Sequence, residues 1–166
     1  MADTPIPSEP RSAGPAVAMV AMKLEVIVIP VSDIDRAKRF YERIGWRLDA
    51  DRSHGADWRV VQFTPVGSHC SVHLGKGNTV APPGSAQGQM LMVADVHAAR
   101  AALLARGVDV SEVFHFDGGR RVADPNARLM GPDPEGLSYR TYASFKDPDG
   151  NGWLLQEIKT RLPGWE

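Results

Sequence analysis

The sequence has little of the material from which several kinds of site are built. It contains a single cysteine, Cys70, among 166 residues. One cysteine excludes an internal disulfide framework and a multi-cysteine zinc site, and it is typical of a protein of the reducing cytoplasm. Neither sign of charge is in excess, because 19 Lys and Arg oppose 20 Asp and Glu. This balance directs the protein neither to nucleic acid nor to an anionic membrane, so we expect a small molecule as its partner.

Long apolar runs and a basic leader are also missing. No stretch approaches the ~20 apolar residues that a membrane-spanning helix needs. The first ten residues include Asp3 and Glu9 but no Lys or Arg, which argues against a signal peptide. Residues 1–21 contain four prolines and no periodic apolar pattern. We therefore predict that residues 1–22 form a disordered tail and that the protein is cytoplasmic.

An internal repeat organises the rest of the chain. Shifting the sequence by 62 residues aligns VSDIDRAKRFYERIGWRL with VADVHAARAALLARGVDV without a gap. In each copy an aspartate, Asp33 or Asp95, can cap the start of a helix. A glycine, Gly45 or Gly107, can take the left-handed conformation that ends one. A strand-like run precedes each helix, and β-rich stretches follow at residues 47–51, 58–64, 71–74, 109–116, 139–146 and 153–158.

Each half is thus predicted to contain a strand, a helix and three strands. We predict the α+β class, with two tandem βαβββ modules that form a cupped, barrel-like mixed sheet with the helices outside. Two ferredoxin-like half-domains packed through their helices are the alternative, which is disfavoured because each copy shows one helix rather than two. The predicted boundaries are a single domain at 23–160, made of module one (23–76), a linker (77–87) and module two (88–160), and a C-terminal tail at 161–166.

Three segments together resemble a known family. VSDIDRAKRFYERIG, its degenerate copy VADVHAARAALLARG and the closing FKDPDGNGWLLQE are similar to segments of the vicinal oxygen chelate superfamily, which includes glyoxalase I, bleomycin-resistance proteins and extradiol dioxygenases. The resemblance covers about residues 23–160. It implies paired modules, often a homodimer, and an open cavity in each curved sheet. It also implies a divalent metal held by a His, Glu or Gln on the first strand and a Glu on the last strand of each module.

The positions that correspond to these metal ligands carry few donors. The family's first-strand ligand lies seven residues before the helix-capping aspartate, which gives Val26 and Gly88 here. The last-strand ligand lies four residues after the glycine of the DPDG turn, which gives Leu154, and its counterpart in module one is His73. One imidazole alone cannot hold a catalytic ion, so we expect no metal and no other cofactor.

The alternation of side chains along the strands predicts which residues face the cavity. His73 alternates with apolar neighbours and could bind a ligand or act as a catalytic base near neutral pH, or it could be a wall residue without chemistry. Gln156 offers a neutral donor and acceptor, and the methionines offer an adaptable apolar wall. The predicted ligand-binding residues are Val26, Val28, His73, Met90, Met92, Leu154 and Gln156.

Three functions remain open. The favoured one is a protein that binds a small organic ligand without a metal. The alternative is a metal-dependent lyase, isomerase or dioxygenase of the glyoxalase type, with His73 as base or ligand and a carboxylate, Glu25 or Glu157, brought in by a shift of register. Otherwise these two carboxylates face solvent at strand ends. The third is a partner-binding protein with a vestigial cavity.

The long connection at 117–138 contains seven Gly or Pro residues and several arginines. Connections of this length are often functional. Arg120, Arg121 and Arg128 could hold a carboxylate or phosphate group of a ligand. The alternative is a solvated, charged loop.

Overall fold

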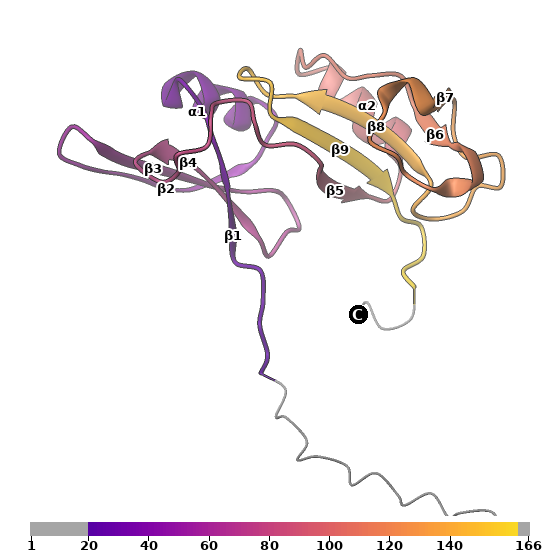
Figure 1. The fold of residues 1–166 in the computed structure, drawn as a ribbon, viewed down its shortest axis with the longest axis horizontal. Helices are drawn as coiled ribbons and strands as arrows, with labels where there is room; N and C mark the ends of the chain where they lie inside the picture. The colour runs from indigo at the N-terminus through magenta and orange to yellow at the C-terminus, as the bar shows by residue number, and fades with distance from the viewer. Residues whose placement is uncertain (1–19, 163–166) are drawn as a thin grey trace, which may run out of the picture.

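The computed structural model describes residues 20–162, which form two mixed sheets side by side (Figure 1). Most of the predicted tail, residues 1–19, and residues 163–166 lie outside this part. Module one consists of β1 (Val26–Ile29), α1 (Ile34–Arg43), β2 (Arg47–His54), β3 (Trp58–Thr64) and β4 (Ser71–Lys76). Its sheet has the order β1-β4-β3-β2, with β1 parallel to β4.

Module two repeats this plan with one additional strand. It consists of β5 (Gln89–Val93), α2 (Val96–Leu104), β6 (Phe114–Phe116), β7 (Arg128–Met130), β8 (Thr141–Lys146) and β9 (Gly152–Glu157). The sheet has the order β5-β9-β8-β6-β7, again with the first and last strands of the repeat in parallel. Short 3₁₀ turns at Asp117–Gly119 and Pro125–Ala127 lie between β6 and β7.

The helix boundaries follow from the repeat as predicted. Oδ1 of Asp33 accepts a hydrogen bond from the backbone N–H of Arg36 at 2.9 Å, and Asp95 does the same for the third residue after it. These aspartates satisfy donors that the first helical turn leaves unpaired. Gly45 and Gly107 have φ of 90° and 73°, the left-handed conformation expected after the last turn. The paired caps are therefore confirmed.

Two predicted segments differ from the structure in the second module. The strand expected at 109–116 is shortened to β6, because the side-chain hydroxyl of Ser111 accepts the backbone N–H of Ser144 and interrupts the ladder after a single bridge at Val110. The connection at 117–138, expected to be a loop, contains β7. Residues 128–130 pair with β6 and extend the sheet to five strands.

The helix-bearing faces of the two sheets share one core. Phe40 and Tyr41 of α1 reach across to module two, with ring centroids 6.4 Å from Phe145 and 6.3 Å from Trp153. The buried core contains Ile29, Ala37, Ile44, Val61, Phe63, Val72 and Leu74 of module one and Val96, Val108, Val110, Val113, Ala143 and Leu155 of module two. Since these faces are packed together, the opposite face of each sheet is left open.

The α+β class, the two βαβββ modules and the curved mixed sheets are confirmed. Each helix lies on the side of its sheet opposite to the open face. Because the open faces point away from the shared core, they do not face each other within the chain. Between residues 20 and 162, no helix is long and apolar enough to cross a membrane.

Candidate ligand-binding site

The open face of the first sheet carries three of the predicted residues. In the parallel pairing of β1 with β4, Val26 lies beside Ser71 and Val28 beside His73. Their neighbours along each strand, including Ile29, Val72 and Leu74, belong to the buried core. Since successive side chains of a strand alternate between faces, Val26, Val28 and His73 face away from the core. This placement agrees with the predicted alternation.

A chain of polar side chains crosses this open face next to His73. The imidazole Nε2 lies 3.0 Å from Oε1 of Gln62, whose Nε2 lies 3.1 Å from Oγ of Ser71. The Ser71 hydroxyl lies 2.8 Å from Oγ1 of Thr64, and Thr64 donates to a carboxylate oxygen of Asp49. The side chains of His73, Gln62, Ser71 and Thr64 are buried or half-buried, so little water competes for the hydrogen bonds among them.

The carboxylate at one end of this chain determines where the protons lie. Hydrogen bonds from Arg47 and then Thr64 lower the pKa of Asp49, which is therefore an acceptor at neutral pH. Thr64 donates its only hydroxyl proton to Asp49, so it can only accept from Ser71. Ser71 therefore donates to Thr64 and accepts a hydrogen bond from the side-chain amide of Gln62. The amide oxygen of Gln62 must then accept from His73, which places the imidazole proton on Nε2. Nδ1 is left as an acceptor for a ligand.

The open face of the second sheet carries the other four predicted residues. Met90 pairs with Leu154 and Met92 with Gln156 in the parallel ladder of β5 and β9. The side-chain amide of Gln156 donates to the backbone oxygen of Tyr139 at 3.1 Å and contacts the hydroxyl of Tyr142 at 3.2 Å. Both amide protons are thereby used, and the amide oxygen is the group that Gln156 can offer to a ligand.

Sequence reasoning missed an aromatic cluster on this same face. Phe114 and Phe116 pack on Tyr142, with ring centroids 5.8 and 5.6 Å away, and Leu154 joins them. Arg128 of β7 lies over the ring of Phe114, with its guanidinium carbon 4.2 Å from the centroid. The apolar alternation of Phe114 and Phe116 was a usable signal. The position of Arg128 could not be predicted, because the sequence indicates a loop where β7 lies.

The predicted residues therefore form two groups in one chain rather than one. Val26, Val28 and His73 lie on the first open face; Met90, Met92, Leu154 and Gln156 lie on the second. The helices and the common core separate the two faces. Each sheet therefore carries its own open face, with its own set of the predicted residues.

The side chains on these faces do not fit the metal centre implied by the family. The first strand offers Val26 and Val28, and β5 opposite Leu154 offers Met90, none of which is a nitrogen or oxygen donor. His73 supplies one imidazole. In the described part of the chain, no three His, Cys, Asp or Glu side chains are grouped closely enough to hold an ion. A catalytic divalent ion normally has at least three protein ligands.

Glu157 is neither a replacement metal ligand nor a solvent-facing residue, so both interpretations of it from the sequence are wrong. Its side chain lies on the core side of β9 and is 8% exposed. Oε2 accepts the backbone N–H of Val96 at 3.1 Å, in the first turn of α2, and Oε1 pairs with Lys159 at 2.9 Å. A negative charge at the start of a helix is stabilised there, so Glu157 has a structural role. Glu25 is exposed, as expected for a residue outside the cavity.

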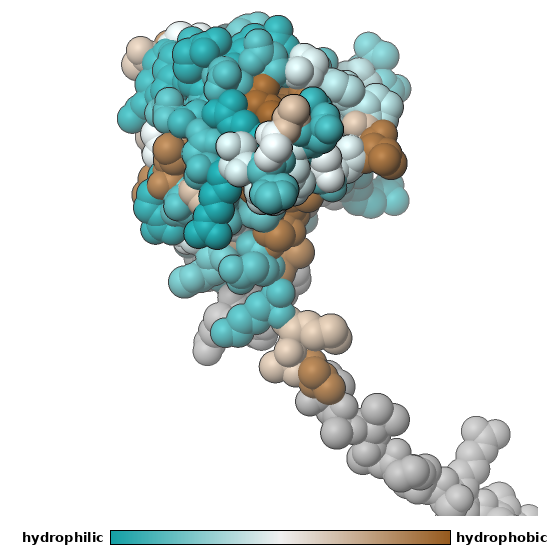
Figure 2. Space-filling model, turned by 90° about the vertical axis from the view of Figure 1, so that its left-hand side faces the viewer, coloured by the Kyte–Doolittle hydropathy of each residue, from teal (hydrophilic) through white to brown (hydrophobic). Residues whose placement is uncertain are grey.

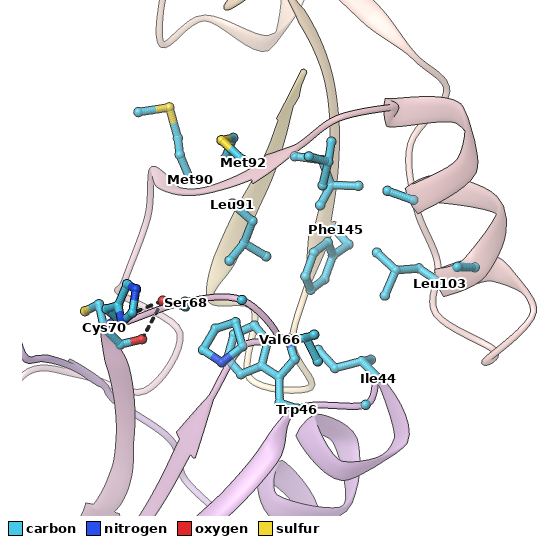
Figure 3. A pocket seen from close by; sticks show the side chains of 18 of the residues that line it. Ile44, Trp46, Val66, Ser68, Cys70, Met90, Leu91, Met92, Leu103 and Phe145 are labelled. Atoms are coloured by element: carbon cyan, nitrogen blue, oxygen red, sulfur yellow. Dashed lines mark hydrogen bonds between the residues drawn. The ribbon is translucent and has the colours of Figure 1, made fainter. Parts of the chain in front are cut away.

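A separate apolar cleft of about 780 Å³ lies between the modules on their helix-bearing sides (Figure 3). Trp46 and Ile44 from module one face Leu103 and Phe145 from module two across it. Met90 and Met92 at its edge are the only predicted ligand-binding residues that line it. Cys70 also lines the cleft, and burial together with the charge of Glu25 raises the pKa of its thiol, so it is not a reactive thiolate.

Comparisons with known proteins identify a matching family and similar solved structures. The sequence profile of the Glyoxalase/Bleomycin resistance protein/Dioxygenase superfamily matches residues 23–155. The chain is similar to the crystal structure of TnmS3, described as an antibiotic binding protein from Streptomyces sp. CB03234. The two share 33% identity and a TM-score of 0.63 over 85% of this chain and 99% of that chain.

Two further structures extend the comparison. A glyoxalase/bleomycin resistance protein from Streptomyces sp. CB03234 shares 33% identity and a TM-score of 0.59, over 81% of this chain and 100% of that one. A superfamily member from Sphaerobacter thermophilus DSM 20745 shares 25% identity and a TM-score of 0.59, over 82% of this chain and 98% of that chain. No curated protein matches the chain significantly. Since the matched segment spans both modules, this chain belongs to the Glyoxalase/Bleomycin resistance protein/Dioxygenase superfamily.

Proposed function

We propose that this protein binds a small organic ligand on the open faces of its sheets and does so without a metal. The observation that carries the proposal is the composition of those faces. Where a metal-dependent relative needs imidazole and carboxylate groups, this chain has Val26, Val28, Met90 and Leu154. Apolar walls with a few fixed polar groups, here His73 and Gln156, are the usual make-up of a binding pocket for small molecules.

The relatives support an antibiotic or a similar natural product as the ligand. TnmS3, at 33% identity, is described as an antibiotic binding protein. Such molecules are large and mostly apolar, with scattered oxygen atoms. The flexible side chains of Met90 and Met92 and the aromatic cluster around Tyr142 could adapt to that shape. A cytoplasmic location, inferred from the single cysteine, is part of the same proposal.

A homodimer completes the cavity in this proposal. The first open face of one chain would cover the second open face of its partner, because the two faces cannot meet within a chain. Val28, Met90 and Met92 on the edge strands are 38–51% exposed. Residues 20–24 extend from the body with Val20, Met22 and Leu24 exposed (Figure 2). Exposed apolar groups of this number indicate a surface that is covered in the assembled protein.

Thermal unfolding in the presence of a panel of aromatic antibiotics tests the ligand proposal. A ligand at 100 times its dissociation constant stabilises the folded state by about 2.7 kcal/mol. We expect a shift with at least one compound, and the Leu154→Glu variant should lose it. The matched control Val66→Glu, on an exposed turn away from the open faces, should keep it. An absence of shifts across the panel would contradict the proposal.

Elemental analysis of protein purified without chelator tests the metal-free part. We expect much less than one transition-metal ion per chain, and a stoichiometric ion would overturn this part of the proposal.

One observation keeps an enzyme of the glyoxalase type as a second candidate. In the tautomer that the contact with Gln62 favours, Nδ1 of His73 is an acceptor on the open face, which is the arrangement that a general base needs. If turnover of any bound ligand is detected, His73→Ala should abolish it, and full activity in that variant would exclude this role.

A further inference from the structure

The second open face contains a hollow that carries an unneutralised positive charge. The hollow, of about 710 Å³, lies where β8 and β9 meet the connection after β6. Its floor includes Phe116, Ser144 and Leu154. Arg121 and Arg128 reach it from the connection, the segment that the sequence marked as a candidate for binding an anionic group.

Arg128 is held in place by contacts that do not neutralise it. Its side chain is half-buried, its guanidinium stacks on Phe114 with the carbon 4.2 Å from the ring centroid, and Nη1 donates to Oγ of Ser144 at 3.2 Å. These contacts fix the plane of the group and satisfy one of its five N–H donors. The remaining donors keep the fork geometry that matches a carboxylate, sulfonate or phosphate.

What distinguishes Arg121 and Arg128 is that they line this hollow and have no carboxylate partner among the described residues. Carboxylates pair with five arginines of the described residues: Arg36, Arg47, Arg59, Arg100 and Arg140. None of the ion pairs found between residues 20 and 162 involves Arg121 or Arg128. The other charged groups that line the hollow are Lys146 and Asp109, so three cations face one carboxylate.

We infer that the ligand of this site is an aromatic anion. Its ring system would lie on Phe116 and Leu154, and its acidic group would accept hydrogen bonds from Arg128 and Arg121. A half-buried cation without a counterion is costly, and an anionic ligand removes that cost as it binds. This inference rests on the proposed binding function and narrows its ligand class.

Two fluorescent probes that differ in one acidic group test the inference on the full-length protein. Anilinonaphthalene sulfonate carries the anion, and phenylnaphthylamine has the same rings without it. We expect Arg128→Gln to weaken binding of the sulfonate by about tenfold or more, since a hydrogen bond between charged groups contributes that much. Binding of the neutral probe should change by less than about twofold, which also shows that the variant is folded.

Matched variants locate the effect. Arg121→Gln should weaken sulfonate binding, and Arg128→Lys, which keeps the charge but loses the fork, should have a smaller effect than Arg128→Gln. Arg120→Gln, in the same connection but outside the hollow, and Arg106→Gln, in the cleft between the modules, should have none. Equal effects of Arg128→Gln on both probes, or no effect on either, would overturn the inference while leaving the binding proposal intact. Failure of both probes to bind the unaltered protein would contradict the binding proposal and this inference with it.

Discussion

At the scale of single residues, the environment of His73 shows how a distant carboxylate can fix the tautomer of an imidazole. Asp49 does not touch the imidazole; three side chains, those of Thr64, Ser71 and Gln62, connect them. Each group in the chain has a fixed number of protons, so the acceptor at one end orients the donors along it. A ligand therefore meets the same tautomer of His73 each time.

Replacing Thr64 by Val should remove this control. Ser71 and Gln62 would lose the direction of their hydrogen bonds, and His73 would populate both neutral tautomers. Nitrogen NMR shifts of the imidazole above pH 8 distinguish the tautomers, and the unaltered protein should show the proton on Nε2. Thr160→Val, at an exposed position, is the control and should change nothing. An unaltered pattern of shifts in Thr64→Val would show that the chain does not set the tautomer.

At the scale of elements, an ionic network connects α1 to β2 and β3 of its sheet. Asp51 of β2 accepts two hydrogen bonds from Arg59 of β3, at 3.0 and 2.9 Å, and one from Lys38 of α1 at 2.8 Å. Arg59 also reaches Asp35 of α1 at 2.9 Å. The hydrogen bonds from Arg59, and then from Lys38, hold the pKa of Asp51 well below its usual range.

This lowered pKa predicts a pH-dependent contribution to stability. A carboxylate whose pKa falls on folding stabilises the protein above its unfolded pKa of about 3.9, and the contribution is lost as the pH falls toward the folded value. Asp51→Asn should lower the free energy of unfolding by about 1–2 kcal/mol at pH 7, and by progressively less below about pH 4. Urea titrations measure both. The control Asp57→Asn, 96% exposed, should have little effect, and a pH-independent loss in Asp51→Asn would contradict the assignment.

The helices and strands differ in how well they could be predicted from the sequence. The helices were found because their caps and apolar stripe are local patterns, present twice at Asp33 and Asp95. The outward positions of His73 and Gln156 followed from strand alternation. The strand at Arg128–Met130 was missed because three residues carry too little pattern, and their pairing with β6 is decided by tertiary contacts. The role of Glu157 was missed because its partner, the start of α2, lies 61 residues away.

At the scale of the whole molecule, one buried amide connects the two modules. Asn151 is fully buried, and its Nδ2 donates to the backbone oxygen of Pro30 in module one and to Asp147 in module two. Its oxygen accepts the backbone N–H of Ala86 in the linker at 3.1 Å. Asp147 in turn accepts from Tyr41, whose pKa is raised by burial and by that carboxylate.

Asn151→Ala should therefore destabilise the protein far more than the loss of one small side chain would suggest. The change leaves a backbone oxygen, a backbone N–H and part of a carboxylate buried without partners, at a cost of about 2–4 kcal/mol. Chemical denaturation measures the loss. Asn126→Ala, at an exposed position in the connection after β6, provides the comparison and should cost less than about 0.5 kcal/mol. Similar values for the two variants would mean that Asn151 does not join the modules.

The arrangement of the open faces leads to a prediction about assembly. The faces are uncovered in one chain, and their edge strands β1 and β5 each have one side without a partner in the described sheets. Unpaired edges and exposed apolar side chains favour association with a second copy. If the faces meet across a homodimer, a charge placed at the centre of that contact should separate the chains, whereas a charge on the linker should not.

Met90 and Val80 are the positions for this comparison. Met90 lies on β5 at the open face and is 51% exposed, and Val80 lies in the linker and is fully exposed. Size-exclusion chromatography with light scattering should give the mass of two chains for the unaltered protein and for Val80→Glu, and the mass of one chain for Met90→Glu. Burying an unpaired carboxylate costs several kcal/mol, enough to dissociate a dimer at micromolar concentration. A monomeric unaltered protein, or a Met90→Glu variant that remains dimeric, would show that the open faces are not joined in this way.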